Sequence, residues 1–362
     1  MARIRLQGIE KKFGAFTAID HLDMVIDDGE LLVLLGPSGC GKSTTLNVIA
    51  GLTPASAGKV MFGEEDVTGL SPHQRNIAMV FQSSLLYPHL TARQNIFMSL
   101  KRSEPSRAEI ERRIAEVAAI VDIERLLDKL PSELSGGERQ RVATAKAIIR
   151  QPTAFLLDEP LGAVDAAMRL TLRSELVNLQ KRLKTTMVFV THDQTEAMTM
   201  GDRIAVMRNG TVEQIGTPDE IYNRPATLFV AGFVGAPPMN FFHGEIDASD
   251  GVPAFVAGPM RVPLPNHATA ERSGRGVTLA VRPQNLRIRL EAGKDAMPVS
   301  VFALEHLGNE SIVIFETTSK DKLRAVVAPG FEARIGEPLH VAFDPAAGKL
   351  FDRTTERPIG SQ

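Results

Sequence analysis

Short apolar runs alternate with helical patterns over roughly the first 235 residues of the chain. Four of these runs are apolar almost throughout, as in parallel strands that are buried on both faces: Leu31–Leu35, Ile77–Phe81, Ala154–Leu157 and Met187–Thr191. A further pair of strands is predicted within Asp202–Ile215, because Asn209-Gly210 favours a two-residue hairpin turn. This pattern predicts an α/β domain with a largely parallel sheet.

Two helices are predicted from apolar residues that recur on one helical face. The first follows a Ser106–Glu109 capping box and carries Ile110, Ile114, Val117 and Val121. The second carries a longer apolar stripe: Met168, Leu172, Leu176, Leu179 and Leu183. Ordinary amphipathicity explains both stripes, so we interpret them as core packing without a catalytic role.

The pattern changes at about Gly235, where Gly235-Ala236-Pro237-Pro238 is typical of a linker. Short strand-like runs separated by Gly, Pro and Asn follow: Phe241–Ile246, Val277–Val281, Leu286–Leu290, Val299–Leu304, Ile312–Phe315, Leu323–Val327 and Leu339–Phe343. No long helical pattern accompanies them. The tail is therefore predicted to be a small all-β barrel or sandwich.

Composition narrows the class of protein. The 362 residues are 43% hydrophobic, which suffices for a sizeable core and excludes a disordered chain. The net charge of −2 excludes a chain-wide basic footprint for nucleic acid or anionic lipid. Cys40 is the sole cysteine, which excludes intrachain disulfides and favours a reducing, cytoplasmic setting. No run approaches the ~20 apolar residues of a membrane span, and polar residues interrupt any signal-peptide core.

The stretch Gly36-Pro37-Ser38-Gly39-Cys40-Gly41-Lys42-Ser43 matches G-x-x-x-x-G-K-[ST]. It lies between a predicted buried strand and a helical run over Ser43–Ala50. Glycines allow several backbone N–H groups to face one concavity, and the helix N-terminus adds positive potential there. Lys42 would then reach the β- and γ-phosphates of a nucleotide, and the Ser43 hydroxyl would ligate Mg²⁺.

An acidic pair, Asp158-Glu159, follows the apolar run Ala154–Leu157. The carboxyl ends of parallel strands are where doubly wound sheets bind their ligands. Asp158 is suited to the Mg²⁺ coordination sphere, and Glu159 to a general base that deprotonates or orients an attacking water.

A second anion cradle is predicted at Ser135-Gly136-Gly137, which precedes a helical run from about Arg139 to Ile149. One nucleotide hardly needs two cradles from the same chain. Two are explained if the second closes over the γ-phosphate bound by a partner subunit. The alternative is a plain helix cap.

These motifs together resemble the ATP-binding subunits of ABC transporters, and more narrowly those of importers of the maltose and glycerol-phosphate type. Further stretches carry the resemblance: Met79–Thr91, Leu134–Glu138, Thr191–Met198, Gly216–Pro218 and Phe233–Gly235, with Val281–Pro283 and Leu307–Glu310 in the tail. The resemblance implies a P-loop NTPase cassette over residues 1–235, with a RecA-like core and a helical subdomain at about 87–152. It also implies an OB-like, all-β regulatory or dimerisation domain over 236–362.

The resemblance also implies roles for single residues. Phe13 would stack on adenine, and Thr44 would complete the phosphate cradle. Gln82 would contact Mg²⁺ as a catalytic residue and act as the hinge of the helical subdomain. Asp165 would act across the dimer, and His192 would contact the γ-phosphate. Ser135, Gly136 and Gly137 would contact the ATP of the partner subunit.

Several positions depart from the family pattern. Phe13 stands where Tyr is more common, Glu138 where Gln is usual, and Gln284 where Glu is usual. The stretch Leu161–Asp165, with Gly162, lacks the Ser and Asn that sugar-importer subunits commonly show. An inward carboxylate at Glu138 would disfavour ATP, so we expect this side chain to point away from the phosphates. A cysteine at a helix start, as at position 40, can have a lowered thiol pKa.

The resemblance implies an ATPase that energises import from the cytoplasmic face of the membrane. Its partners would be a second ATPase subunit, identical or paralogous, and two membrane permeases that dock through coupling helices. A periplasmic or lipoprotein solute-binding protein would take part indirectly, and nucleic acid would not. A sugar, sugar alcohol or glycerol-type solute is the expectation. Polyamines, other organic solutes and inorganic anions remain alternatives.

Two other classes of function fit the residues less well. Soluble ABC proteins that act on DNA or ribosomes have long coiled coils or tandem cassettes, whereas this chain has one phosphate loop, one Ser-Gly-Gly signature and no heptads. A nucleotide-sensing regulator without catalysis would need neither Glu159 nor His192.

Overall fold

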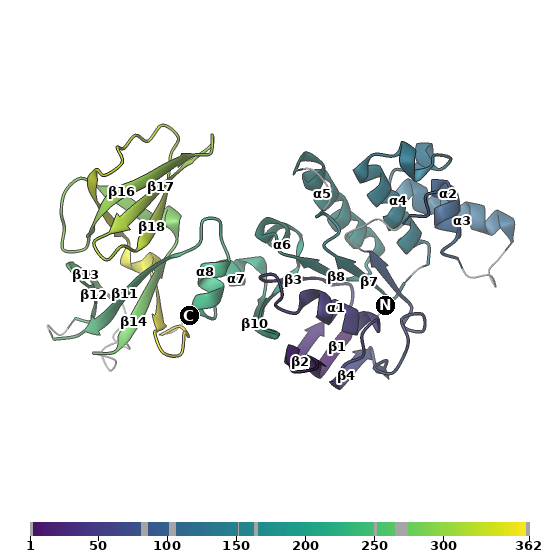
Figure 1. Ribbon diagram of the computed structural model, residues 1–362, viewed down its shortest axis with the longest axis horizontal. Coiled ribbons are helices and arrows are strands. Elements are labelled where there is room, and N and C mark those ends of the chain that lie inside the picture. Colours follow the sequence, from purple (N-terminus) through teal and green to yellow (C-terminus); the bar gives the residue numbers. More distant parts are fainter. Residues whose placement is uncertain are drawn as a thin grey trace. The chain divides into compact units, whose positions relative to one another are not determined.

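The computed structural model describes residues 3–80, 86–100, 106–150, 152–162, 166–249, 252–264 and 274–359. The chain divides into two compact units, Met1–Pro218 and Asp219–Gln362, each with its own core (Figure 1). Helices α7 (Pro218–Asn223) and α8 (Leu228–Phe233) precede the strands of the second unit. The domain boundary at residue 235 stays a prediction.

A six-stranded sheet forms the centre of the first unit, and all its pairs are parallel except β9 with β10. Its strand order is β10 (Thr211–Gly216), β9 (Arg203–Arg208), β3 (Leu31–Leu35), β8 (Thr186–Thr191), β7 (Ala154–Asp158) and β6 (Ile77–Val80). The four predicted apolar strands are therefore confirmed to within one residue. Phe81, the predicted last residue of one of them, lies outside the described residues.

The predicted hairpin is formed by β9 and β10. Asn209 and Gly210 have φ values of 49° and 83°, which is the left-handed conformation that a tight two-residue turn requires. The Gly210 N–H donates to the carbonyl oxygen of Cys40 at 3.0 Å. The turn therefore supports the loop that precedes α1.

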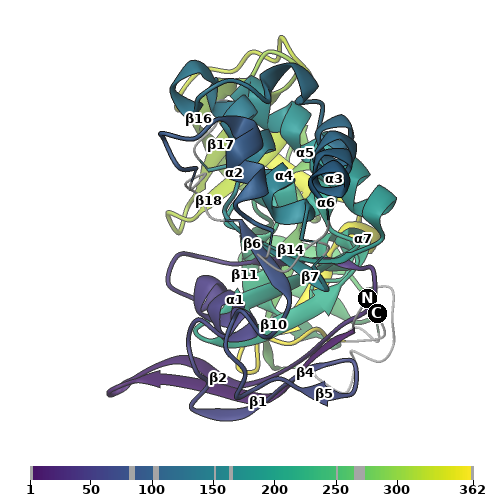
Figure 2. The same cartoon turned by 90° about the vertical axis from the view of Figure 1, so that its right-hand side faces the viewer.

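A four-stranded antiparallel sheet, not predicted above, completes the β-structure of the first unit. Its order is β2 (Phe16–Ile26), β1 (Ile4–Phe13), β4 (Ala57–Phe62) and β5 (Glu65–Asp66). Helix α1 (Lys42–Ala50) lies between this sheet and the central one (Figure 2). Buried side chains from all three layers, such as Ile9, Leu46 and Leu34, form one hydrophobic core.

The remaining helices of the first unit are α2 (Ala92–Phe97), α3 (Arg107–Ile120), α4 (Gly136–Ile148), α5 (Ala166–Leu183) and α6 (Gln194–Met200). Ser106 caps α3 as predicted, but the predicted capping box is only half formed, because the Glu109 carboxylate accepts hydrogen bonds from Arg112 instead of from the Ser106 N–H. None of the described helices is both long enough and apolar enough to cross a bilayer.

The second unit contains two five-stranded antiparallel sheets, which confirms the prediction of an all-β tail. One has the order β13 (Met260–Pro263), β12 (Ala254–Ala257), β11 (Asn240–Asp247), β14 (Gly276–Val281) and β20 (Lys349–Asp352). The other has the order β15 (Leu286–Arg289), β19 (Pro338–Phe343), β16 (Met297–His306), β17 (Ser311–Thr317) and β18 (Lys322–Val327). Side chains of both sheets share one core, in which the rings of Phe242 and Phe343 are 5.4 Å apart.

The C-terminal end of α1 is held by a buried arginine. The Arg75 guanidinium is 4% exposed and donates to the carbonyl oxygens of Val48 and Ile49 at 2.7 and 2.8 Å. It also donates to the carbonyl oxygens of Leu70 and Thr68. The bonds to Val48 and Ile49 give charged donors to carbonyls of the last turn of α1, and a cation at this end interacts favourably with the helix dipole.

We therefore expect Arg75→Met to lower the free energy of unfolding by about 2–4 kcal/mol, because buried carbonyls lose charged donors. Urea unfolding followed by far-UV circular dichroism measures the change. Arg3→Met is the matched control, since Arg3 is a half-exposed member of a surface ion pair and should change stability by less than about 1 kcal/mol. Equal effects of the two substitutions would contradict this role of Arg75.

Candidate functional site

The predicted phosphate loop connects β3 to α1 and has the backbone conformation that its glycines allow. Gly39 and Gly41 have φ values of 80° and 106°, and Gly41 is the N-cap of α1. A Cβ atom at Gly41 would lie 2.6 Å from the carbonyl oxygen of Ala18 in β2. Glycine is thus required here both for the left-handed backbone and for the close approach of a neighbouring strand.

The Lys42 side chain is buried within this loop. It is 6% exposed, and its Nζ donates to the carbonyl oxygens of Gly36 at 2.8 Å and Pro37 at 3.0 Å. Within the described part of the chain, no carboxylate forms an ion pair with Lys42. A buried ammonium with only neutral acceptors favours an anionic ligand.

Thr45, which the sequence analysis did not select, stabilises the same turn. Its hydroxyl donates to the carbonyl oxygen of Gly41 at 2.9 Å. Pro37, Ser38 and Gly39 are exposed in the same loop, and Thr44 is half-buried on α1. The signal for Thr45 was its position four residues after the N-cap, where a threonine can bond back to the helix.

Two candidate Mg²⁺ ligands meet at the end of the central sheet. The Ser43 hydroxyl donates to Asp158 Oδ1 at 2.9 Å, although the residues are 115 positions apart. Burial raises the pKa of the Asp158 carboxyl; the Ser43 hydrogen bond opposes this shift, and the Glu159 charge adds to it. A cation would relieve this cost, and Mg²⁺ accepts one or two protein oxygens besides phosphate and water. The donor set therefore fits Mg²⁺ bound with a nucleotide.

Nowhere in the described ranges do three or more His, Cys, Asp or Glu side chains gather in a group that could hold a metal by themselves. Gln82, the third predicted Mg²⁺ ligand, lies outside the described residues, as does Asp165.

Glu159 and His192 meet across the ends of two neighbouring parallel strands. His192 Nδ1 lies 3.2 Å from Glu159 Oε2, and the Glu159 N–H donates to the carbonyl oxygen of Val190 at 3.1 Å. Glu159 has a φ of 45°, which is strained for a residue with a side chain. Both side chains remain partly accessible, so they can act on a water bound beside the phosphate loop.

The loop that carries His192 is fixed by residues that the sequence analysis did not select. Asp193 caps α6 by accepting hydrogen bonds from the N–H groups of Thr195 and Glu196. The Thr191 hydroxyl accepts from the Asp193 N–H and donates to the buried Glu196 carboxyl at 2.5 Å. An aspartate before a helical run is the signal by which this cap could have been found.

The Ser135-Gly136-Gly137 segment begins α4, with Ser135 as the N-cap. Gly137 packs closely against the Met168 side chain, and a Cβ there would lie 2.7 Å from the Met168 sulfur, so a larger residue would displace that side chain. No hydrogen bond or ion pair of the described residues joins this segment to the phosphate loop of the same chain. Ser135 and Gly136 are exposed at the helix start, where a second chain can reach them.

The unusual Glu138 is a structural residue. Its carboxylate accepts a hydrogen bond from the Ser135 N–H at 2.8 Å, and its own N–H donates to the Ser135 hydroxyl. The Ser135 backbone N–H thereby holds the pKa of Glu138 below its ordinary range. This capping box turns the carboxylate back onto Ser135 and stabilises the first turn of α4.

Phe13 lies at the tip of the β1–β2 hairpin, opposite Phe16, and is 52% exposed. The Lys11 ammonium lies 4.8 Å from the centre of its ring. Ala18, further along β2, contacts the phosphate loop at Gly41. The hairpin thus presents an exposed aromatic face on the strand pair that supports the loop.

The lowered thiol pKa expected for Cys40 is wrong. Cys40 is 3% exposed, and burial raises the pKa of its thiol. The Lys42 ammonium, with Nζ 3.9 Å from the sulfur, opposes this effect but does not outweigh it. The side chain points into the core beneath the loop and does not line it.

Comparisons with known proteins agree with this geometry. The ABC transporter family model matches residues 19–162, the MalK OB fold domain model 235–286 and the TOBE domain model 279–351. The chain is 44% identical to the sulfoquinovosyl glycerol transport ATP-binding protein SmoE of Agrobacterium fabrum, covering 99% of this chain and 100% of that protein. It is 43% identical to the trehalose/maltose import ATP-binding protein MalK of Thermococcus litoralis, with the same coverage.

A solved structure is similar to part of the chain. It is a dimeric ATP-binding cassette in a post-hydrolysis state with ADP and Pi bound, with a TM-score of 0.53 and 31% identity. The match covers 59% of this chain and 98% of that one.

We expect Cys40 in the folded chain to react with maleimide at least about tenfold more slowly than in urea, because its burial and raised pKa leave little exposed thiolate. Bound ATP should slow the reaction further. Mass spectrometry of timed samples measures the rate.

The matched control is Ser38→Cys in a Cys40→Ser background, which places the thiol at an exposed position of the same loop. This variant should label rapidly when folded. Equal rates for the two thiols in the folded chain would contradict the burial of Cys40.

Proposed function

Because the chain belongs to the family of ATP-binding subunits of ABC transporters, we propose that its strand-end site hydrolyses ATP to drive solute import. The observation that supports this most directly is a group of side chains at the ends of β3, β7 and β8. This group contains Lys42, the hydrogen-bonded pair of Ser43 and Asp158, and the pair of Glu159 and His192. The protein is an ATPase of the ABC type and binds ATP or ADP. The roles of individual residues and the solute are the proposal.

The phosphate loop and Phe13 bind the nucleotide. The segment Gly36–Thr44 surrounds the phosphates with its backbone N–H groups, of which Pro37 has none. The Lys42 ammonium exchanges its loop carbonyls for phosphate oxygens. Phe13 stacks on adenine, for which a phenyl ring supplies the same apolar face as the more common tyrosine. The helix dipole of α1 adds to the attraction for the phosphates.

Ser43, Asp158 and Gln82 would hold Mg²⁺. When bound with the nucleotide, Mg²⁺ neutralises charge on the phosphate oxygens. Asp158, whose pKa is raised by burial, gains a partner for its carboxylate in this arrangement.

Glu159 accepts the proton of the attacking water, and His192 orients Glu159 and contacts the γ-phosphate. The 3.2 Å contact between them holds the Glu159 carboxylate in one direction, and the strained φ of Glu159 aims it out of the strand end. The barrier is lowered by positioning and by charge neutralisation at the γ-phosphate.

Ser135, Gly136 and Gly137 act on the ATP of a second ATPase subunit, either an identical chain or a paralogue. Ser135 and Gly136 are exposed at the N-terminus of α4, which leaves the Ser135 hydroxyl and the first backbone N–H groups of the helix available to an incoming γ-phosphate. The Glu138 capping box keeps that hydroxyl oriented without placing a carboxylate on the phosphate. Asp165 contributes across the same interface.

The segment around α2 is the proposed contact for the coupling helices of two membrane permeases. Tyr87, Phe97 and Met98 are each about half exposed, and buried Asn95 fixes Tyr87 by accepting from its N–H and donating to its carbonyl oxygen. Exposed apolar side chains on a fixed backbone suit a partner helix. The chain would therefore work on the cytoplasmic face of the membrane, with a solute-binding protein on the other side.

A sugar, sugar alcohol or glycerol-type compound is the proposed solute. Two relatives match this chain over almost its full length. One is named for sulfoquinovosyl glycerol transport and the other for trehalose and maltose import. The match of the tail to the MalK OB fold model supports the same subfamily. A polyamine or other non-sugar solute is the alternative.

We expect Glu159→Gln to reduce the turnover of ATP by at least about 10²-fold, because the general base is lost while the phosphate loop is intact. Phosphate release and equilibrium binding of a fluorescent ATP analogue separate hydrolysis from binding. The matched control is Glu64→Gln, which changes a side chain that is 94% exposed. Wild-type turnover in Glu159→Gln, or loss of binding along with turnover, would contradict the assignment.

Reconstitution with candidate permease subunits and a candidate solute-binding protein tests the solute. We expect ATP-dependent uptake of a labelled sugar or glycerol derivative into proteoliposomes, and none with Glu159→Gln. Putrescine and sulfate serve as competitors of other classes. Uptake of putrescine but no sugar would overturn the solute class while leaving the ATPase assignment intact.

A further inference from the structure

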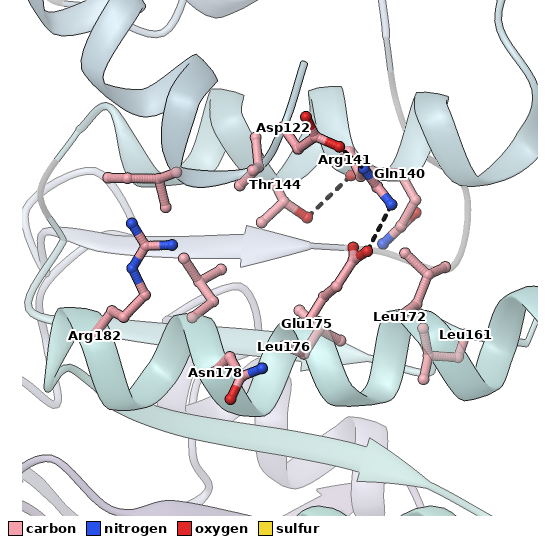
Figure 3. A pocket seen from close by; sticks show the side chains of 13 residues that line it. Asp122, Gln140, Arg141, Thr144, Leu161, Leu172, Glu175, Leu176, Asn178 and Arg182 are labelled. Atoms are coloured by element: carbon pink, nitrogen blue, oxygen red, sulfur yellow. Dashed lines mark hydrogen bonds and ion pairs between the residues drawn. The ribbon is translucent and has the colours of Figure 1, made fainter. Parts of the chain in front are cut away.

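A cavity of about 200 Å³ lies between α4 and α5, apart from every residue of the ATP site (Figure 3). The end of α3 closes one side, and Leu161, after β7, closes another. All of its walls belong to the first unit, so it is a feature of one compact body. An engineered cavity of ~150 Å³ admits benzene, so this volume admits one ring with a short substituent.

One wall of the cavity is apolar. Leu172, Leu176 and Leu179 of α5 are buried members of the stripe interpreted above as core packing. In Figure 3 the labelled leucines of α5 and Leu161 flank the space below α4. The stripe therefore packs only in part against α4, and the remaining apolar surface suits a hydrocarbon group.

A buried polar group points into the opposite wall. Gln140 of α4 is 6% exposed, and its Nε2 has no hydrogen-bond partner in the part of the chain that the structure describes. Figure 3 places the Gln140 amide on the cavity side of α4, facing α5. An unsatisfied buried N–H group is costly, and an acceptor atom on a ligand would remove that cost.

The charged side chains next to Gln140 are already paired with one another. Arg141 contacts Asp122 at 3.1 Å and Glu175 at 2.5 Å, so its guanidinium is paired with two carboxylates. A ligand anion next to Gln140 would be repelled by Asp122 and Glu175, and a ligand cation would meet the Gln140 N–H and the Arg141 guanidinium. Arg182 is exposed at the far rim. The surroundings favour an uncharged ligand.

We propose that this cavity binds a small uncharged molecule with one ring and one hydrogen-bond acceptor, such as an amide or ketone carbonyl. The ring contacts the α5 leucines, and the carbonyl oxygen accepts from Gln140 Nε2. This site does not rest on the proposed ATPase mechanism. Its position bears on that mechanism, because α4 begins at Ser135 and an occupant sets the spacing of α4 and α5.

Acetanilide is the probe, because it combines a phenyl ring with an amide carbonyl. The chain contains no tryptophan, so Asn178→Trp places a single fluorophore at the exposed rim of the cavity. We expect a saturable change in its emission as acetanilide is added to the full chain. Saturation-transfer NMR on the unmodified chain should give the same affinity without a reporter.

Gln140→Leu in the Asn178→Trp background should weaken acetanilide binding about three- to tenfold, because one hydrogen bond is lost. Gln7→Leu, at an exposed position of β1, should leave it unchanged. Propylbenzene lacks a hydrogen-bond acceptor, so it should bind Gln140→Leu and Gln7→Leu with equal affinity. Leu176→Phe should abolish binding by filling the cavity, which keeps the test decisive if Gln140→Leu does not fold.

Two results would overturn the proposal. The first is the absence of saturable binding to both the reporter variant and the unmodified chain. The second is acetanilide binding to Leu176→Phe or Gln140→Leu that is as tight as to the Asn178→Trp chain, which would place the probe elsewhere.

Discussion

Parallel pairing of β3, β8 and β7 is the constraint on which the site depends. Parallel strands end at the same edge of a sheet, so the phosphate loop after β3, the acidic pair after β7 and His192 after β8 emerge together. Residues more than 100 positions apart thus come within hydrogen-bond distance, as for Ser43 and Asp158. β3 and β8 are buried along their whole length, as is typical of strands in a parallel sheet covered on both faces.

The same convergence creates electrostatic costs that a ligand would relieve. The buried Lys42 ammonium has only uncharged hydrogen-bond partners among the described residues, and burial raises the pKa of Asp158 beside Glu159. The Lys42 ammonium and the Asp158 carboxylate interact electrostatically, but no ion pair joins them. Phosphate oxygens would pair with the Lys42 ammonium, and a cation would pair with the Asp158 carboxylate. A nucleotide with Mg²⁺ supplies both partners, which accounts for its fit to the site.

The sequence predicted the parts of this site that depend on local pattern. The apolar strands, the phosphate loop, the acidic pair and the Asn209-Gly210 hairpin are each specified by a few consecutive residues. The antiparallel sheet of β1, β2 and β4 was missed, because β1 carries polar side chains and irregular register that obscure a period of two. Arg75 could not be found, since its partners on α1 lie 26 and 27 positions away.

Two further results show where local reasoning fails. At Cys40 the helix-start argument gave the wrong sign of the pKa shift, because it omitted burial beneath the loop. On α5 the periodicity identified the buried face, but it carries no information on how completely another helix fills that face. By contrast, the capping box of Ser135 and Glu138 could have been found from its spacing alone.

The central claim is that one nucleotide is held by the phosphate loop of one chain and by Ser135 of another. Mixing two inactive variants, Lys42→Ala and Ser135→Phe, tests it most directly. A mixed dimer would contain one site with both an intact Lys42 and an intact Ser135, so ATP turnover should reappear on mixing and rise with the fraction of mixed dimers. Turnover in the mixture no greater than the sum of the separate variants would contradict the claim.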